Sequence, residues 1–178
     1  MNNPNQNLFS HCPSCGRKSL VPRNEKAFQC RECSLVFYMN CASAAIGLIA
    51  NEKGELLVTR RKRNPAAGTL DLPGGFIEPG ESAEQGLKRE IKEELNLEVT
   101  GMTYFTSAPN TYVFKDVQYA VTDLAFICRV DDFSPISADD DVAEFFFIPP
   151  EKIDPALFGL DSPKIIIRHY RQHIGSPL

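Results

Sequence analysis

Apolar residues recur every four positions in the middle of the chain, at Ala83, Leu87, Ile91 and Leu95. An α-helix has about 3.6 residues per turn, so these side chains form one stripe along a helix. Ser82 precedes the stripe as a candidate N-cap, and Gln85 completes the pattern of a capping box. Asn96 follows it, and asparagine readily adopts the left-handed conformation that ends many helices. The pattern predicts a helix over residues 83–95.

Shorter apolar stretches predict strands, because they are rich in β-branched and aromatic residues and lie between turn-forming residues. Residues 44–50 and 55–61 flank a polar segment that contains Gly54, which predicts a β-hairpin. Further strands are predicted over residues 112–114, 119–130 and 145–148. The dipeptide Ser162-Pro163 is typical of a helix start, with serine as N-cap and proline at the first helical position. A second helix is therefore predicted to run to about residue 173.

Three glutamates share one face of the first predicted helix, because Glu90, Glu93 and Glu94 are spaced i, i+3 and i+4. Like charges at that spacing destabilise an exposed helix by roughly 0.2–0.5 kcal/mol per pair. A hard divalent cation offsets this repulsion, and Mg²⁺ is usually bound through one or two carboxylates and substrate phosphates. A solvated charged face is the simpler alternative. Arg89 lies four residues before Glu93 and is expected to pair with it.

The segment before the helix, residues 72–81, reads LPGGFIEPGE and is rich in glycine and proline. Such a turn brings backbone amides and carbonyls close to a metal or a phosphate. Gly86 inside the helix costs about 1 kcal/mol relative to alanine, which suggests that a ligand or another backbone segment approaches there. Loop and helix together favour a metal site for phosphate chemistry over a solvated helix face.

Residues 75–97 resemble the Nudix box, the loop–helix signature of hydrolases that act on nucleoside diphosphates linked to another moiety. The signature's charged positions and first glycine are all present, at Gly75, Glu81, Arg89, Glu90, Glu93 and Glu94. Asn96 stands where the family usually has glycine, and asparagine tolerates the same backbone conformation. The resemblance extends more weakly over residues 44–150. It implies an α+β fold, the Nudix α/β/α sandwich with a mixed sheet.

The resemblance also implies roles for the matched residues. Glu90 and Glu94 would bind Mg²⁺ or Mn²⁺ near the backbone carbonyl of Gly74. Glu93 would complete the metal cluster or polarise the attacking water. The remaining two charged residues, Glu81 and Arg89, would orient these carboxylates.

The general base of such a reaction lies either in the box or in a later loop. Glu144 and the acidic run of residues 139–141 are candidates outside the box, and Glu144 is also a candidate substrate contact. An ordinary solvated loop is the simpler interpretation of the acidic run. The base is therefore left open between these groups and the box glutamates.

Substrate contacts are expected from a basic run and from an aromatic residue. Arg61 and Arg63 end a predicted strand and are candidate contacts to the diphosphate, with a solvated charge run as the alternative. Tyr112 is a candidate for stacking on a nucleobase, although an aromatic residue near a strand is more often part of the core. Residues 108–112 are expected to form a loop near the mouth of the site.

Two C-x-x-C pairs stand near the N-terminus, at Cys12, Cys15, Cys30 and Cys33. Four thiolates at this spacing are typical of a structural zinc ribbon. Disulfides are the alternative, but the first ten residues are polar and lack a signal-peptide pattern, and no apolar run is long enough to span a membrane. A reducing, cytoplasmic location is expected, which favours zinc. Cys41 and Cys128 are expected to pack as small apolar residues.

Composition sets the remaining limits. The chain has 178 residues, 43% of them hydrophobic, and a net charge of −4. This content is sufficient for a core, and the negative charge argues against a general nucleic-acid binder. We expect a zinc ribbon over residues 1–40, with a structural or dimer-supporting role that leaves a homodimer open, and a Nudix domain over residues 41–178. The expected partner is a small nucleotide substrate.

Two classes of function follow. The first is metal-dependent hydrolysis of the diphosphate bond in a substrate of the NADH, FAD or ADP-ribose type, since ribbon-bearing Nudix hydrolases are familiar among enzymes acting on dinucleotide cofactors. The second is a nucleotide-sensing or nucleic-acid-binding protein that keeps the fold without turnover. The complete set of box residues favours the enzyme, because a sensor has no need of every catalytic charge.

Overall fold

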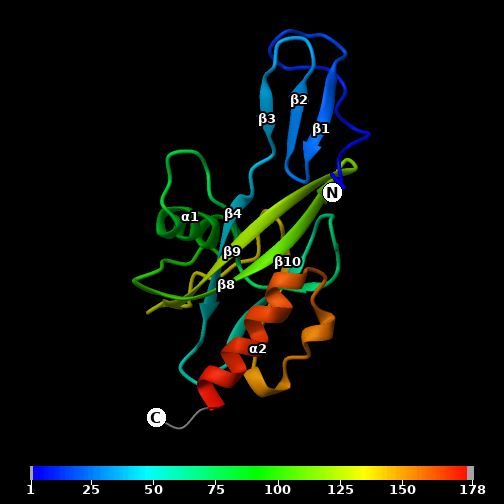
Figure 1. Ribbon diagram of the computed structural model, residues 1–178. Coiled ribbons are helices and arrows are strands. Elements are labelled where there is room, and N and C mark those ends of the chain that lie inside the picture. Colours follow the sequence, from blue (N-terminus) through cyan, green and yellow to red (C-terminus); the bar gives the residue numbers. More distant parts are fainter. Residues whose placement is uncertain (1, 176–178) are drawn as a thin grey trace. The chain divides into compact units, whose positions relative to one another are not determined.

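The computed structural model describes residues 2–175 and divides the chain into two compact units (Figure 1). One unit combines the residues up to Ala42 with the segment Thr111–Ala120. The other comprises Ser43–Asn110 and the residues from Val121 onward. Within the described residues, neither helix is long and apolar enough to cross a membrane.

The first unit contains a three-stranded antiparallel sheet in the order β1-β2-β3, formed by Leu20–Asn24, Ala27–Cys30 and Val36–Tyr38. Phe28 is fully buried at its centre, with the ring of Phe9 packed edge-on against it. The side chain of Asn5 pairs with the backbone of Gln118, donating to its carbonyl and accepting from its N–H at 2.8 Å each. The N-terminal segment is thereby joined to the segment Thr111–Ala120 within this unit.

The remaining strands form two further sheets. Their orders are β7-β4-β9-β8 and β10-β5-β6. The strands are β4 (Ala42–Ile49), β5 (Leu56–Arg61), β6 (Leu70–Asp71), β7 (Gly74–Phe76), β8 (Gly101–Phe114), β9 (Val117–Arg129) and β10 (Val142–Ile148). The helices are α1 (Ala83–Leu95) and α2 (Asp161–Gly175), with short 3₁₀ turns at Pro150–Lys152 and Pro155–Leu157.

These two sheets have a helix on each face, and α1 and α2 lie on opposite sides of the strands in Figure 1. Alternate residues of β4 show why: Ile46 and Leu48 join one apolar cluster, whereas Ala45 and Ile49 join the other. The helices add Ile166, Ile167 and Tyr170 to the first cluster and Leu87, Ile91 and Leu95 to the second. Full burial of one such aliphatic side chain stabilises the fold by about 1.5–3 kcal/mol. The predicted α+β fold with an α/β/α sandwich is confirmed.

The predicted hairpin over residues 44–61 is wrong. β4 lies between β7 and β9, whereas β5 lies between β10 and β6, and a single bridge between Ala50 and Leu56 joins them at the turn. The turn itself forms, with the Asn51 side chain accepting from the backbone N–H of Lys53 and Glu55. A pattern of apolar residues indicates a strand but does not specify its partner, and the partners here come from distant segments.

Two other predictions need correction. Residues 108–112 are not a loop but part of β8, and a proline is compatible with β8 because it is the last strand of its sheet, where alternate N–H groups have no neighbouring strand to bind. Helix α2 begins at Asp161, and Ser162 is not its N-cap: the buried Ser162 hydroxyl donates to the Asp123 carboxylate. Local turn and cap preferences were overridden by tertiary contacts.

Candidate active site

Helix α1 is fixed at both ends by the caps that its sequence predicts. At the start, the Gln85 N–H donates to Ser82 Oγ at 3.2 Å, and the Ser82 N–H donates to Gln85 Oε1 at 2.8 Å. At the end, Asn96 adopts φ 54° and its N–H donates to the Lys92 carbonyl. The caps fix where the helix begins and ends, and the burial of Leu87, Ile91 and Leu95 in an apolar cluster sets the direction of the glutamate face.

Strand β7 is a glycine strand that lies against this face. A Cβ at Gly75 would stand 2.5 Å from the carboxyl carbon of Glu90, so only glycine leaves room for that carboxylate. Gly74 has φ 134°, and a Cβ there would collide with the backbone carbonyl of Ala45 on β4. The Gly74 N–H donates to Glu94 Oε2 at 2.9 Å. The loop glycines therefore bring backbone and carboxylates into direct contact.

Arg89 joins the loop to the helix. Its Nε and Nη2 donate to the two carboxylate oxygens of Glu81 at 2.8 and 3.0 Å, and Nη2 also donates to the Phe76 carbonyl. Its Nη1 donates to Glu90 at 2.9 Å and to Glu93 at 3.0 Å. The hydrogen bond from Arg89 lowers the pKa of Glu81, and the three carboxylates together raise the pKa of Arg89. The arginine fork thus holds three glutamates in defined orientations.

Gly86 allows the loop to pack against the helix. A Cβ at this position would lie 3.1 Å from Glu81 Oε2 and 3.4 Å from the Cα of Ile77. The close backbone approach that the mid-helix glycine suggested is therefore present, and it places Glu81 within reach of Arg89.

Burial makes the centre of this face unfavourable for negative charge. Glu94 is only 7% exposed, and its burial, together with the charges of Glu90, Asp71 and Asp141, raises its pKa to about 8, even though the Gly74 N–H opposes the shift. Burial also raises the pKa of Glu90. Glu93, by contrast, is exposed. A cation bound here would relieve the desolvation and repulsion of the buried carboxylates.

The acidic run that precedes β10 is tied to the end of α1. The Asp139 N–H donates to the Glu94 carbonyl at 2.9 Å, and Asn96 Nδ2 donates to the Pro135 carbonyl at 3.0 Å. Asp141 Oδ1 is a buried oxygen that lies 2.8 Å from Arg63 Nη1 but receives no hydrogen bond. The backbone of the acidic run is therefore anchored beside the carboxylates, while the side chains of Asp139 and Asp140 are exposed.

The donor set at this site fits a hard divalent cation. Carboxylate oxygens are the ligands that Mg²⁺ and Mn²⁺ prefer, and burial raises the pKa of two of the carboxyls, those of Glu90 and Glu94. Without a bound ion, Glu90 and Glu93 are paired with Arg89. The carboxylate oxygens are accordingly not gathered into a group: in the described part of the chain, only the N-terminal cysteines bring three or more ligand atoms within 4.8 Å of one another.

The four candidate substrate contacts lie in different surroundings. Arg61 is mostly buried and pairs with Asp71 at 2.5 Å, whereas Arg63 is exposed and pairs with the acidic run. Glu144 pairs with Arg60 on the neighbouring strand at 2.5 Å. Tyr112 belongs to the segment of β8 that groups with the N-terminal unit. Their contact with a substrate stays a prediction.

Asp71 is a buried acidic residue of this site that the sequence reasoning missed. It is 8% exposed, accepts from the Leu72 N–H, and its charge contributes to the raised pKa of Glu94. Its position between Leu70 and Leu72 was a usable signal. An acidic residue inside a short apolar stretch is rarely buried without a partner.

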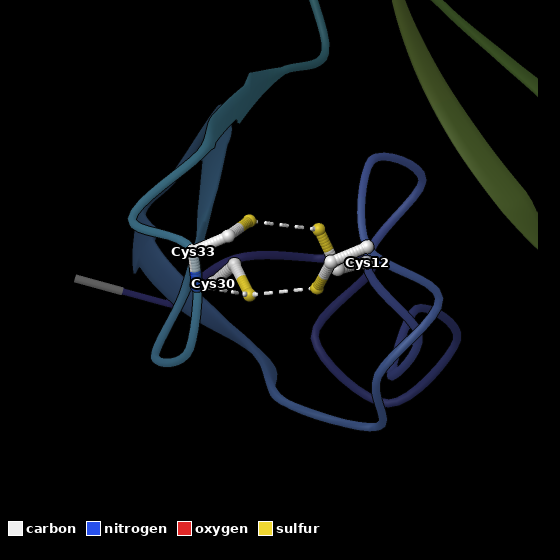
Figure 2. Close-up of side chains that lie close together, drawn as sticks. Cys12, Cys30 and Cys33 are labelled. Atoms are coloured by element: carbon white, nitrogen blue, oxygen red, sulfur yellow. Dashed lines mark hydrogen bonds between the residues drawn. The ribbon is translucent and has the colours of Figure 1, made fainter.

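The four N-terminal cysteines converge, as Figure 2 shows for Cys12, Cys30 and Cys33. Sγ atoms are 3.6 Å apart for Cys12 and Cys33 and 3.7 Å apart for Cys15 and Cys30, so these pairs are not disulfides. Zinc–sulfur bonds of about 2.3 Å in a tetrahedron imply sulfur separations of about 3.8 Å. The cluster therefore fits a zinc ion.

Hydrogen bonding within the cluster favours a thiolate at Cys30, whereas the neighbouring cysteines and burial raise the pKa of the Cys33 thiol to about 11. The backbone N–H of Cys33 and the hydroxyl of Ser19 lower the pKa of the Cys30 thiol to about 6.

The two remaining cysteines lie in different surroundings. Cys128 is buried, as expected, in the apolar cluster that contains Leu87 and Ile91 of α1. Cys41 is exposed, so the expectation that it packs as an apolar residue is wrong.

Three features define a Nudix-type domain: the glycine strand β7, the capped helix α1, and sheets with a helix on each face. A cysteine cluster precedes this domain in the sequence. Residues 41–169 match the family model described as NUDIX domain, and the chain belongs to the Nudix family. Similar solved structures include a NUDIX hydrolase from Nitrosomonas europaea (TM-score 0.64, 19% identity, 95% of each chain) and the MutT protein from Methanosarcina mazei Go1 (TM-score 0.59, 24% identity, 79% of this chain and 99% of that one). At these identities the likeness concerns the fold.

Curated relatives are similar in sequence over part of their length. The NAD-capped RNA hydrolase NudC of Vibrio vulnificus is 35% identical over 98 residues, which cover 55% of this chain and 37% of the relative. The protein of the same name from Vibrio atlanticus is 29% identical over 126 residues, covering 71% and 46%. The chain thus spans less than half the length of either relative.

Proposed function

We propose that this chain is a metal-dependent pyrophosphohydrolase that cleaves the diphosphate bond of a nucleoside diphosphate linked to another moiety. The observation that carries the proposal is the contact between the glycine strand and the glutamate face of α1. Gly75 leaves room for the Glu90 carboxylate, and the Gly74 N–H binds Glu94. A fold that served only for binding would not need buried carboxylates held at this cost in desolvation.

The metal site consists of Glu90 and Glu94, with the backbone carbonyl of Gly74 and Glu93 as further ligands. When bound, Mg²⁺ or Mn²⁺ supplies charge neutralisation for the diphosphate and lowers the pKa of a bound water. Arg89 orients Glu90 and Glu93, and Glu81 holds Arg89 by two hydrogen bonds. Since the pKa of Glu94 is about 8 without metal, binding of the ion requires release of its proton near neutral pH.

The general base is a carboxylate at the rim of this face. Glu93 is exposed and so reaches solvent, and the anchored run of residues 139–141 places Asp140 and Asp141 where their charges act on Glu90 and Glu94. Both candidates are compatible with removal of a proton from an attacking water. Glu144 is the weaker candidate, because it is paired with Arg60.

We assign the four N-terminal cysteines to a structural zinc ion. Four thiolates leave no open coordination position, so this metal stabilises the ribbon and takes no part in catalysis. The ribbon has a small core, consisting of Cys12, Leu20, Phe28 and Cys30, and a core of this size gains much of its stability from a metal.

The proposed substrates are NAD-type dinucleotides, with FAD and ADP-ribose as related candidates. Support comes from the relatives named as NAD-capped RNA hydrolases, which match the chain in sequence over 98 and 126 residues. The test is product release from NADH, NAD⁺, FAD, ADP-ribose, diadenosine polyphosphates and nucleoside triphosphates, with Mg²⁺ and with Mn²⁺. Two monophosphate products from one substrate, formed far faster than from the rest, support the proposal. No turnover of any compound by zinc-replete protein contradicts it and favours a sensor.

A further inference from the structure

Arg61 and Asp71 form a mostly buried ion pair next to the proposed active site. The guanidinium Nη1 lies 2.5 Å from Asp71 Oδ2, and the two side chains are 18% and 12% exposed. The second oxygen of Asp71 accepts from the Leu72 N–H at 2.9 Å, two residues before the glycine strand. Asp71 is therefore held on both oxygens.

The same guanidinium also holds the loop of residues 62–69. Arg61 Nε donates to the Pro65 carbonyl at 2.8 Å, in the middle of this loop. Backbone bonds close the loop at its base, since the Gly68 N–H donates to the Arg61 carbonyl and the Arg61 N–H donates to the Thr69 carbonyl. With one nitrogen on Asp71 and another on Pro65, Arg61 connects the loop to β6.

The loop in turn contacts the acidic run beside the carboxylates. The Lys62 N–H donates to the Asp141 carbonyl at 2.8 Å, and Arg63 Nη1 lies 2.8 Å from Asp141 Oδ1. The acidic run is bonded to the end of α1 through the Asp139 N–H and the Glu94 carbonyl. A hydrogen bond or ion pair therefore connects each step from Asp71 to the proposed metal ligands.

We propose that Arg61 and Asp71 are a pair of positioning residues: Asp71 fixes the Arg61 guanidinium, and Arg61 fixes the 62–69 loop that places Asp141 and Arg63 at the active site. Arg61 then acts through the loop rather than on the substrate diphosphate. This inference rests on the proposed function for its kinetic consequences, but the anchoring of the loop is a property of the fold.

Three variants, two single and one double, separate positioning from direct binding and from plain stability. Arg61→Lys keeps the charge beside Asp71 but lacks the planar fork that serves Asp71 and Pro65 at once. Asp71→Asn keeps Arg61 but removes the charge that orients it. Arg61→Gln combined with Asp71→Asn removes both charges, so no buried charge is left unpaired. Lys92→Gln on α1, which breaks an exposed ion pair with Glu98 beyond the end of the helix, is the matched control.

The expected result is a loss in kcat with the fold retained. Arg61→Lys and Asp71→Asn should each lower kcat by about 10- to 100-fold, since a displacement near 1 Å of positioned groups costs on this order. The double variant should lose less than the product of the two single losses, because the two residues act as one unit. KM should change less than kcat in both single variants. The melting temperature of Arg61→Lys should stay near that of the wild type. The control Lys92→Gln should have the kcat, KM and melting temperature of the wild type.

Amide hydrogen exchange provides a readout that does not need turnover. The Lys62 and Gly68 amides, which donate to Asp141 and Arg61, should exchange faster in Arg61→Lys and Asp71→Asn than in the wild type or in Lys92→Gln. Unchanged exchange in both variants would overturn the inference. So would a rise in KM alone in Arg61→Lys, which indicates direct substrate binding. A wild type that turns over no compound defeats the proposed function, and the exchange data then decide the inference alone.

Discussion

Arg89 donates two hydrogen bonds to Glu81, from Nε at 2.8 Å and from Nη2 at 3.0 Å, across eight residues of sequence. The two groups meet because Gly86 lets the loop approach the helix backbone. This pair closes the loop onto α1 and leaves Nη1 free to orient Glu90 and Glu93, which it reaches at 2.9 and 3.0 Å. The geometry of the carboxylate face therefore depends on a residue that is not itself a proposed metal ligand.

Replacement of Arg89 by lysine tests that dependence. Lysine retains the positive charge but presents no planar fork, so it does not hold Glu81, Glu90 and Glu93 together. We expect kcat to fall about 10- to 100-fold, the loss associated with imprecise positioning of catalytic groups. The measurement is steady-state kinetics with Mg²⁺ beside Lys88→Gln, an exposed neighbour on the same helix. Wild-type kcat in Arg89→Lys would show that the fork is dispensable.

Alanine at the two loop glycines should have different consequences. In Gly75→Ala, the new methyl group meets the flexible end of Glu90, so the fold should tolerate the change while the carboxylate is displaced. In Gly74→Ala, it meets the Ala45 backbone at a positive φ, so the fold itself should be destabilised.

Thermal melting and kinetics together distinguish the two glycine variants. Gly75→Ala should melt within a few degrees of the wild type and lose about tenfold or more in kcat/KM. Gly74→Ala should melt at least several degrees lower. Gly75→Ala protein with undiminished activity would contradict the packing of Glu90 against this strand.

The stability of metal-free protein should fall as pH rises toward 8. Burial raises the pKa of Glu94 from an ordinary value near 4.5 to about 8, so the folded state binds a proton that the unfolded state has already lost. The contribution of this carboxyl is fully present below about pH 4.5 and is lost as pH rises to about 8.

Chemical unfolding of Glu94→Gln across this pH range isolates the effect. The variant should be more stable than the wild type near pH 8, by about 1–3 kcal/mol, and nearly equal to it at pH 4.5. Mg²⁺ should stabilise the wild type near pH 8 and not the variant. Glu98→Gln, at a side chain that is 77% exposed, is the control and should follow the wild type. A wild-type advantage at pH 8 without metal would reverse the assignment of Glu94 as an unfavourable buried charge.

The cysteine cluster should bind one zinc ion per chain. Metal analysis of purified protein measures the ratio directly, and Cys15→Ser should lower it severalfold because one of four thiolates is lost. Cys41→Ser is the matched control and should retain the metal, since Cys41 lies outside the cluster. Equal zinc content in both variants would mean that the four converging sulfurs do not hold the ion.

Much of the fold was predictable where a local pattern and its tertiary role agree. Helix α1 has the expected bounds because its caps and its apolar stripe act within one segment. The same holds for the cysteine pairs, whose spacing alone predicts convergence. The partners of β4 and β5 were not predictable, because each strand has apolar residues on both faces and its neighbours come from distant sequence.

The site was predictable only as far as the motif reaches. The sequence indicates that Glu90, Glu93 and Glu94 share a face, but not that Glu94 is nearly buried or that Asp71 acts on it, because burial depends on the strands that cover the helix. Pro109 and Ser162 were misinterpreted for the same reason. An edge strand tolerates the proline, and a buried carboxylate, Asp123, takes the serine hydroxyl.

Turnover by Glu94→Gln is the most direct test of the central claim, that the buried carboxylates of α1 hold a catalytic divalent cation. The assay uses the fastest substrate of the nucleotide panel at saturating Mg²⁺ and Mn²⁺, with Glu98→Gln as control and melting curves to verify the fold. We predict a rate below about a tenth of wild type, a loss of more than about 1.4 kcal/mol of transition-state stabilisation, with Glu98→Gln unaffected. A folded Glu94→Gln protein that keeps more than a tenth of the wild-type rate would contradict the metal assignment.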